Sequence, residues 1–475
     1  MTSAAPARRR RSRGVLEWPL VGALLRWRHS RLLLQVPLFL VALVLVLHGL
    51  FGPRLAPMNL ATVMVWVHYR GALVLVLLVA GNLFCMGCPM LALRDLARRF
   101  VHPRFDWPQA LRNKWLSIGM LVGVLFGYEL FDWWGDPRAT AWLIVAYFGA
   151  ILAVDLVFKH ASFCKFVCPI GQFNFAASTI SPLEIRAADA RVCETCTTKD
   201  CIKGSELSRG CELALFVPEK RGNMDCTFCL DCVHACPHEN VALARHEPAD
   251  DLGLDPHRSG LGRFSKRPDL AALVTVFCFG ALLNAFGMVS PVYAVQRWMA
   301  GVMHVESEWP VLTALFGVAL VVEPLVLLGL ACWATRAATG SHESLLTLGV
   351  RHAYCLAPLG FGIWIAHYSF HFLTGLLTFV PVLQKALCDL GAPILGQPIW
   401  RLGGLPKSAA LPIELGLLSL GVIASCVVAW RIAERSASRR TLAAFLPWAA
   451  LVLLLAGAAV WLFEQPMEMR GTFLQ

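Results

Sequence analysis

The sequence predicts a mainly α-helical, polytopic membrane protein with a small α+β domain inserted in the middle of the chain. Three observations lead to this fold class. The 475 residues are 57% hydrophobic and only 15% charged, which is uncommon in soluble proteins. The apolar residues fall in long blocks, and a helix needs roughly 20 of them to cross the hydrocarbon core. One long polar interval, rich in cysteine, interrupts these blocks.

The apolar blocks predict nine transmembrane helices, with ends uncertain by a few residues. The predicted spans are 33–51, 61–84, 115–132, 140–158, 270–288, 310–334, 353–379, 411–432 and 442–463. The basic run "RRRRSR" precedes the first span, and no small-residue cleavage site follows it. We therefore expect an uncleaved first span rather than a secretory signal.

The basic clusters predict the orientation of the chain in a cell inner (cytoplasmic) membrane. Positive residues collect in alternate loops, as the positive-inside rule requires. The clusters are "RRRRSR", "RDLARRFVHPR", "KRPD" and "RIAERSASRR". This pattern puts the N-terminus in the cytoplasm and the C-terminus in the periplasm or exterior. It also accounts for the net charge of +11 without a nucleic-acid partner.

The pattern of blocks divides the chain into four regions. Residues 1–32 form a basic cytoplasmic N-terminus, and 33–158 form a four-helix membrane region. Residues 159–269 form a cytoplasmic ferredoxin-like domain, for the reasons given next. Residues 270–475 form a second membrane region of five helices.

A run of four cysteines in the polar interval carries the clearest chemical signal. The run "CTFCLDCVHACP" supplies Cys226, Cys229, Cys232 and Cys236, followed by Pro237. This C-x2-C-x2-C-x3-C-P spacing is typical of bacterial [4Fe–4S] ferredoxins. Zinc sites usually combine two C-x2-C pairs that are well separated in sequence, and disulfides are rare in the reducing cytoplasm. We therefore expect an iron–sulfur cluster here.

A second set of four cysteines lies upstream, with a spacing that departs from the ferredoxin run. It comprises Cys193, Cys196, Cys201 and Cys211. In two-cluster ferredoxins the fourth cysteine of a run ligates the other cluster. This rule assigns Cys193, Cys196, Cys201 and Cys236 to a first [4Fe–4S] cluster, and Cys226, Cys229, Cys232 and Cys211 to a second. One cluster beside a degenerate remnant is the alternative.

Two further cysteine pairs close predicted spans, in "FCMGCPM" and "FCKFVCPIGQF". They are Cys85 with Cys88 and Cys164 with Cys168, each pair followed by proline. Residues three or four apart share one helix face, and proline is expected to stop each helix. Because both pairs lie at the cytoplasmic membrane boundary, we interpret them as a soft-metal site, for instance for copper, or as a redox relay. Inert buried thiols are the alternative.

These motifs make residues 30–250 resemble the polyferredoxin-like membrane iron–sulfur proteins of the NapH, NosR C-terminal and CcoG (FixG) type. "FCKFVCPIGQF" matches the second cysteine pair of that family, whereas "FCMGCPM" is one residue shorter than its first. The resemblance implies electron transfer through two [4Fe–4S] clusters, often linked to the quinone pool. It does not extend to residues 270–475.

Histidines within the predicted spans mark a second region of interest, since ionisable groups in a membrane are costly. His367 and His371 stand four apart, and His68 lies toward the outer end of the second span. Three interpretations stay open: ligands of a haem b, proton partners of a quinone, or structural hydrogen bonding between helices.

The sequence favours an integral membrane electron-transfer protein that passes electrons between a membrane donor, expected to be quinol, and a redox partner protein. We expect a component of an oxidoreductase system rather than a stand-alone enzyme. One alternative is a copper reductase or assembly factor for a respiratory oxidase, with copper held by the Cys-Pro pairs. Another is a redox sensor or scaffold.

Overall fold

The computed structural model describes residues 14–206 and 208–467, and the run "RRRRSR" lies outside them. Within these residues, seven helical segments are long and apolar enough to cross a membrane. They are Ser30–Phe51 (α2), Leu60–Ala80 (ending in α4, Arg70–Ala80), Pro137–Asp155 (α8), Pro268–Phe286 (α15), Glu308–Thr339 (ending in α18, Glu323–Thr339), Lys407–Ser436 (α22) and Ser438–Glu464 (including α23, Thr441–Glu464). The chain is therefore a mainly helical, multi-pass membrane protein.

Two of the nine predicted spans differ from the others. Helix α7, Trp115–Leu130, has only 16 residues, fewer than the roughly 20 of a full span. The predicted span 353–379 belongs to a bent pair. Its helix α20, Leu356–Thr374, turns by 54° into α21, Phe379–Asp389. The structure thus supports seven spans, or eight if the bent pair counts as one.

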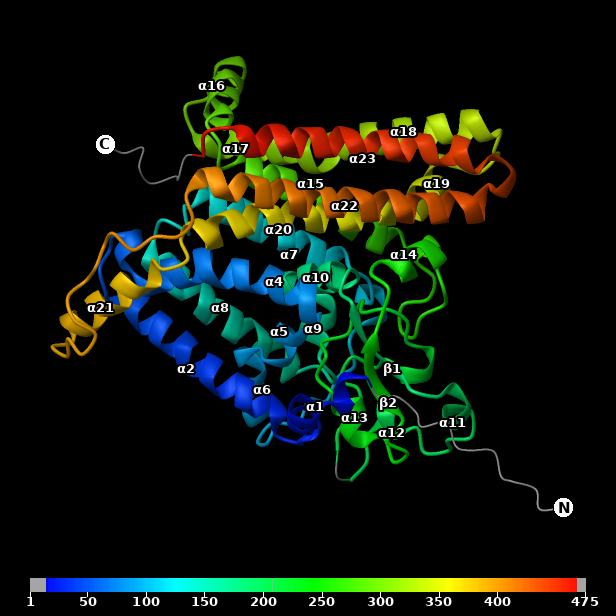
Figure 1. Cartoon of the computed structure of the whole chain (residues 1–475), viewed down its shortest axis with the longest axis horizontal. Coiled ribbons are helices and arrows are strands. Elements are labelled where there is room, and N and C mark those ends of the chain that lie inside the picture. Colours follow the sequence, from blue (N-terminus) through cyan, green and yellow to red (C-terminus); the bar gives the residue numbers. More distant parts are fainter. Residues whose placement is uncertain (1–13, 207, 468–475) are drawn as a thin grey trace.

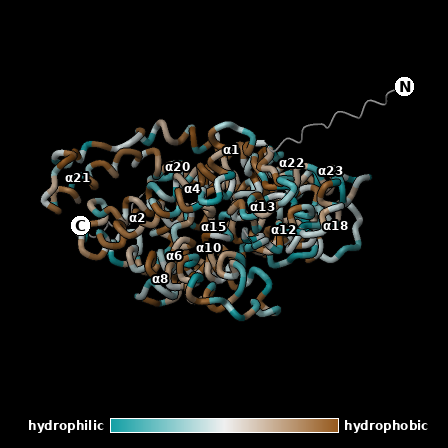
Figure 2. Tube along the Cα trace, turned by 90° about the horizontal axis from the view of Figure 1, so that it is seen from below, coloured by the Kyte–Doolittle hydropathy of each residue, from teal (hydrophilic) through white to brown (hydrophobic). Residues whose placement is uncertain are grey.

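The long helices lie side by side with their axes roughly aligned (Figure 1). Helices α15 and α20 form the centre, where 78% of the apolar window of α15 is buried. Helices α22, α23 and α18 pack together on one side, and α2 and α8 pack together on the other. Only 11% of the apolar window of α2 is buried, so most of the surface of this helix is exposed; Figure 2 colours the whole chain by hydropathy.

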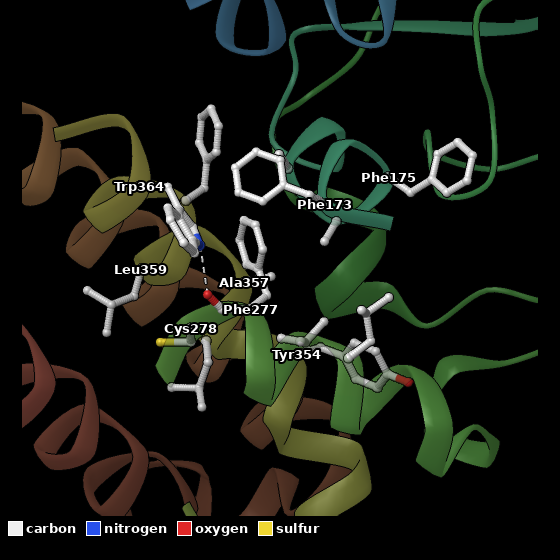
Figure 3. Close-up of a cluster of buried hydrophobic side chains, with 14 of the residues drawn as sticks. Phe173, Phe175, Phe277, Cys278, Tyr354, Ala357, Leu359 and Trp364 are labelled. Carbon is white, nitrogen blue, oxygen red and sulfur yellow. Dashed lines mark hydrogen bonds between the residues drawn. The ribbon is translucent and has the colours of Figure 1, made fainter. Parts of the chain in front are cut away.

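An aromatic cluster joins α10, in the predicted cytoplasmic domain, to two helices of the second predicted membrane region (Figure 3). Phe173 lies on α10, Pro169–Ser178, and its ring centroid is 5.2 Å from that of Phe277 and 5.3 Å from that of Trp364. The indole N–H of Trp364 donates to the carbonyl of Phe277 over 2.8 Å. The two contacts of Phe173 are edge-to-face, and such contacts add to the stabilisation from burial alone. Residues from α10, α15 and α20 therefore share one hydrophobic core.

A two-stranded antiparallel sheet frames the cysteine-rich segment at one end of the bundle (Figure 1). Strand β1, Leu183–Ala187, pairs with β2, Val241–Arg245, so that Leu183 lies opposite Arg245 and Ala187 opposite Val241. Among the described residues, the connection between the strands contains three short α-helices and one short 3-10 helix, Val217–Glu219; the α-helices are α11, Ala190–Glu194; α12, Asp200–Lys203; and α13, Asp231–Ala235. The antiparallel pairing brings the start and the end of this segment together.

Candidate cysteine-rich site

The sheet positions the first cysteine of the segment beside the last. Beyond the final strand pair, the Ala188 N–H donates to the carbonyl of Asn240 over 2.9 Å. The side chain of Asn240, 2% exposed, donates to the Asp189 carbonyl at 2.7 Å and to the Cys193 sulfur at 3.3 Å. Its backbone N–H reaches the Cys236 sulfur at 3.3 Å. One asparagine thus ties Cys193 to Cys236, which are 43 positions apart in sequence.

Four cysteines line a small cavity of about 20 Å³ at the edge of the sheet, and we call them the outer set. They are Cys193, Cys196, Cys201 and Cys236. The backbone N–H of Lys199 hydrogen-bonds Cys196 and lowers the pKa of its thiol, which favours the thiolate. Thiolates that accept N–H hydrogen bonds are the usual ligands of an iron–sulfur cluster. The donor chemistry of the outer set therefore fits such a cluster.

The other four cysteines form an inner set: Cys211, Cys226, Cys229 and Cys232. Cys211 is close enough to interact electrostatically with each of the other three. The loop that carries them turns tightly, because Asp225, Phe228 and Leu230 have φ values of 60°, 54° and 62°. Burial raises the pKa of Cys211 to about 11. A buried set of thiols needs a bound cation to become a set of thiolates.

Throughout the described part of the chain, no three Cys, His, Asp or Glu side chains converge tightly enough to hold a single metal ion. A [4Fe–4S] cluster makes a different demand, since each cysteine binds its own iron. The structure brings the eight cysteines into two sets of four, with the same members that the crossing rule assigns. That each set binds a cluster stays a prediction.

Side chains from three parts of the membrane region hold the loop of the inner set. Arg31, in the first turn of α2, pairs with Asp231 at 3.0 Å. Asn82, which follows α4, donates to the Cys226 carbonyl at 2.7 Å. The ammonium group of Lys114, which precedes α7, lies 2.6 Å from Asp225. The inner set therefore lies against the membrane helices, whereas the outer set lies at the far edge of the sheet.

A buried ion-pair network stabilises the junction between the membrane helices and the cysteine-rich segment. Arg94, on α6 (Pro89–Ala97), is fully buried between Asp155 at 3.2 Å and Glu212 at 2.8 Å. Arg209 also pairs with Glu212, at 3.1 Å. Burial alone would raise the pKa of Glu212, but the guanidinium groups of Arg94 and Arg31 outweigh it and hold this pKa well below its usual value. Glu212 is therefore ionised at neutral pH.

The Cys-Pro pairs correct one expectation from the sequence. Proline is predicted to stop each helix, but in the structure it begins a new one. Cys88 precedes Pro89 at the start of α6, and Cys168 precedes Pro169 at the start of α10, where its sulfur accepts the Gly171 N–H at 3.2 Å. Proline suits the first helical position because its missing N–H would have no partner there. The two thiols of each pair therefore flank a helix break instead of sharing one helix face.

The four thiols of the Cys-Pro pairs nevertheless come together. Cys88 interacts electrostatically with Cys85, Cys164 and Cys168. The side chain of Asn174 donates to the Cys85 sulfur over 3.2 Å. Burial raises the pKa of Cys168 to about 12. Cys85 also interacts with Cys226 of the inner set, so these thiols lie between the membrane helices and the inner set.

The three predicted histidines fall into two places. The rings of His367 and His371 on α20 lie 5.0 Å apart, and both interact with Arg70 of α4. The ring of His68 instead contacts Phe372 and Phe379. Both ring nitrogens of buried His367 lack a hydrogen-bond partner among the described residues. The structure thus pairs two of the histidines and leaves the third apart.

Sequence reasoning did not identify the residues that support the cysteines. Arg31, Asn82, Lys114 and Asn240 each contact a cysteine or its loop, yet none belongs to a recognisable motif. Polar residues at the ends of apolar blocks were the available signal. Such residues indicate where a membrane span ends, but they do not predict which distant loop their side chains will contact.

Comparisons with known proteins give a partial resemblance to the polyferredoxin-like membrane proteins. The chain is 24% identical over 193 residues to the ferredoxin-type protein NapH of Escherichia coli strain K12, covering 36% of this chain and 66% of that protein. It is 26% identical over 190 residues to the regulatory protein NosR of Stutzerimonas stutzeri, covering 35% of this chain and 25% of that protein. No family model and no solved structure matches. The predicted resemblance is confirmed over about a third of the chain.

Proposed function

We propose that this protein is a membrane electron-transfer protein that carries electrons between a quinol in the bilayer and a redox partner protein. The outer set would hold one [4Fe–4S] cluster and the inner set a second. Each cluster, when bound, supplies a one-electron carrier. In this proposal residues 159–269 form a cytoplasmic domain, and the C-terminus faces the periplasm.

One observation carries the proposal: the eight cysteines form two sets at different depths. Asp231 and the loop around Cys226 are held by Arg31 and Asn82 from the membrane region. Cys196 instead belongs to a loop at the edge of the sheet. An electron carrier that joins a membrane to a soluble partner needs one site at each boundary. The name of NapH, a ferredoxin-type protein, agrees with this interpretation.

Replacing one inner-set cysteine tests the proposal. Protein purified or reconstituted without oxygen should contain about eight irons and eight sulfides per chain. Cys211→Ser should lose about half of both, because one ligand of four is gone. Cys388→Ser, outside both sets, should retain the full amount. Iron and sulfide analysis with electron paramagnetic resonance after reduction is the measurement; metal-free wild-type protein under these conditions would refute the proposal.

A second candidate function is a copper reductase or assembly factor. It is favoured by the convergence of Cys85, Cys88, Cys164 and Cys168 next to the inner set, since soft thiolates prefer Cu(I). The double variant Cys164→Ser/Cys168→Ser separates the two functions. Loss of Cu(I) binding with both clusters retained would favour the copper function, and unchanged Cu(I) binding would count against it.

A further inference from the structure

A groove of about 500 Å³ lies where α2 and α6 meet α13, and we call it the α2–α6–α13 groove. Its lining includes Val36 of α2, Asp95 of α6, and Asp231 and His234 of α13. We propose that this groove binds the head group of a quinone or quinol. The inference rests on the proposed electron-transfer function and assigns a place to its membrane donor.

The groove is open to the bilayer along α2. Leu32 and Val36 line it and are 44% and 47% exposed, and Phe39 continues the apolar wall one turn further into the span. Because α2 is the least buried of the long helices, a ligand with a hydrophobic tail can reach the groove laterally from the lipid. Ligand sites of this kind combine apolar walls with a few polar groups.

Two arginines at the inner end of the groove are paired with carboxylates, and Arg28 and Arg99 at its rim make the lining as a whole positive. Arg31 is paired with Asp231 at 3.0 Å, and Arg209 with Asp95 at 3.0 Å. Two nitrogens there lack a hydrogen-bond partner among the described residues: Nη2 of Arg31, whose residue is 9% exposed, and Nε2 of His234. Arg31 Nη2 otherwise has only long ion-pair contacts of 3.9 and 4.0 Å. Buried polar atoms without partners are costly, and a quinone carbonyl oxygen can accept from the Arg31 guanidinium.

The same end of the groove adjoins the inner cysteine set. Asp231 precedes Cys232 directly, and His234 follows it by two residues on α13. Arg31 interacts electrostatically with Cys229. A ligand that exchanges electrons with the inner set must bind close to it. A lipid that only fills space between helices could bind anywhere along the bundle. The position therefore favours a quinone over a structural phospholipid.

Narrowing the groove tests the proposal with a matched control on the same helix. Val36→Trp places an indole at the groove, whereas Val44→Trp, two turns further along α2 at a site that is 52% exposed, lies outside it. The measurement is calorimetric titration of the purified full chain in detergent with decylubiquinone. We expect Val36→Trp to weaken binding by about tenfold or more and Val44→Trp to change it by less than about twofold. Equal binding by both variants would overturn the proposal.

A third variant separates a quinone from an anionic phospholipid. Arg28 and Arg99 line the rim of the groove and would attract a phosphate group. Arg28→Gln/Arg99→Gln should leave the affinity for decylubiquinone within about twofold. If the groove instead holds phosphatidylglycerol that this variant loses and decylubiquinone does not displace, the proposal is wrong. Iron and sulfide content of the same samples reports the proposed electron-transfer function independently, because it does not depend on the groove.

Discussion

Asn240 shows how a single side chain can organise a cysteine site. Its amide group joins the Asp189 backbone and the Cys193 sulfur, and its backbone N–H reaches Cys236. Hydrogen bonds to the sulfur ligands are one of the main controls on the reduction potential of an iron–sulfur cluster. Removal of an N–H donor from a ligating thiolate makes the reduction potential of the cluster more negative. The reason is that the oxidised cluster carries less negative charge and needs the donor less.

Asn240→Ala should therefore lower the reduction potential assigned to the outer set. It should also destabilise the segment by about 1–3 kcal/mol, because polar backbone groups of Asp189 lose their partner. A redox titration followed by electron paramagnetic resonance measures the first effect. Asn223→Ala is the control: Asn223 is equally buried, and its side chain donates to the carbonyls of Ser178 and Leu183 instead of to a sulfur. Equal reduction potentials in the two variants would show that the hydrogen bonds of Asn240 do not control the potential of the outer set.

At the scale of elements, the junction between α6, α8 and the cysteine-rich segment depends on Arg94. Arg94→Met leaves Asp155 and Glu212 buried without their shared cation. Breaking a buried pair in this way costs about 3–5 kcal/mol. We expect earlier thermal unfolding in detergent, with the cysteine-rich segment becoming sensitive to protease at a lower temperature.

A surface pair provides the comparison for Arg94. Arg191→Met removes an ion pair with Asp189 in which the arginine side chain is 87% exposed, and such pairs contribute about 0–1 kcal/mol. A similar loss of stability in both variants would show that the Arg94 network does not fasten the junction.

The elements also show how far sequence alone could go. Apolar length predicted the spans because a bilayer sets that length, and α2, α8 and α15 lie within a few residues of their predicted limits. Helix α7 also lies within two residues of its predicted limits, but its 16 residues are fewer than the roughly 20 of a full span. The Cys-Pro motif marked the right places but the wrong local geometry, because proline suits a helix start as well as a helix end.

The cysteine sets were more predictable than their surroundings. The crossing rule for two-cluster ferredoxins groups Cys193 with Cys236 from the spacing of the cysteines, and the β1–β2 pairing provides the physical reason that they lie together. Contacts such as Arg31 with Asp231, 200 positions apart, depend on how the helices pack. No local pattern encodes that packing.

At the scale of the whole molecule, the two ends of the bundle should face different compartments. Helix α21 lies at the end of the bundle away from the β1–β2 sheet (Figure 1), and it carries Cys388. With the sheet in the cytoplasm, a membrane-impermeant maleimide should label Cys388 in intact spheroplasts. Cys196, which a bound cluster would protect, should react only after the membrane is permeabilised and iron is removed with a chelator.

Mass spectrometry of the labelled chain measures this orientation. Cys388→Ser should abolish the label in intact spheroplasts and serves as the control for specificity. Labelling of Cys196 but not of Cys388 before permeabilisation would reverse the orientation and place the cysteine-rich segment outside.

The contacts that hold the loop of the inner set have a consequence for the order of events during synthesis of the chain. Cys226, Cys229 and Cys232 are each at most 8% exposed and are held by Arg31, Asn82 and Lys114. These holding residues leave the ribosome before the cysteines do, since synthesis runs from the N-terminus. Arg31, Asn82 and Lys114 are therefore already synthesised when the loop emerges, and if the inner set binds a cluster as proposed, closure of the loop would compete with the delivery of iron and sulfide. A maturation factor that keeps the loop away from α2 until iron and sulfide are bound would let cluster insertion precede closure of the loop.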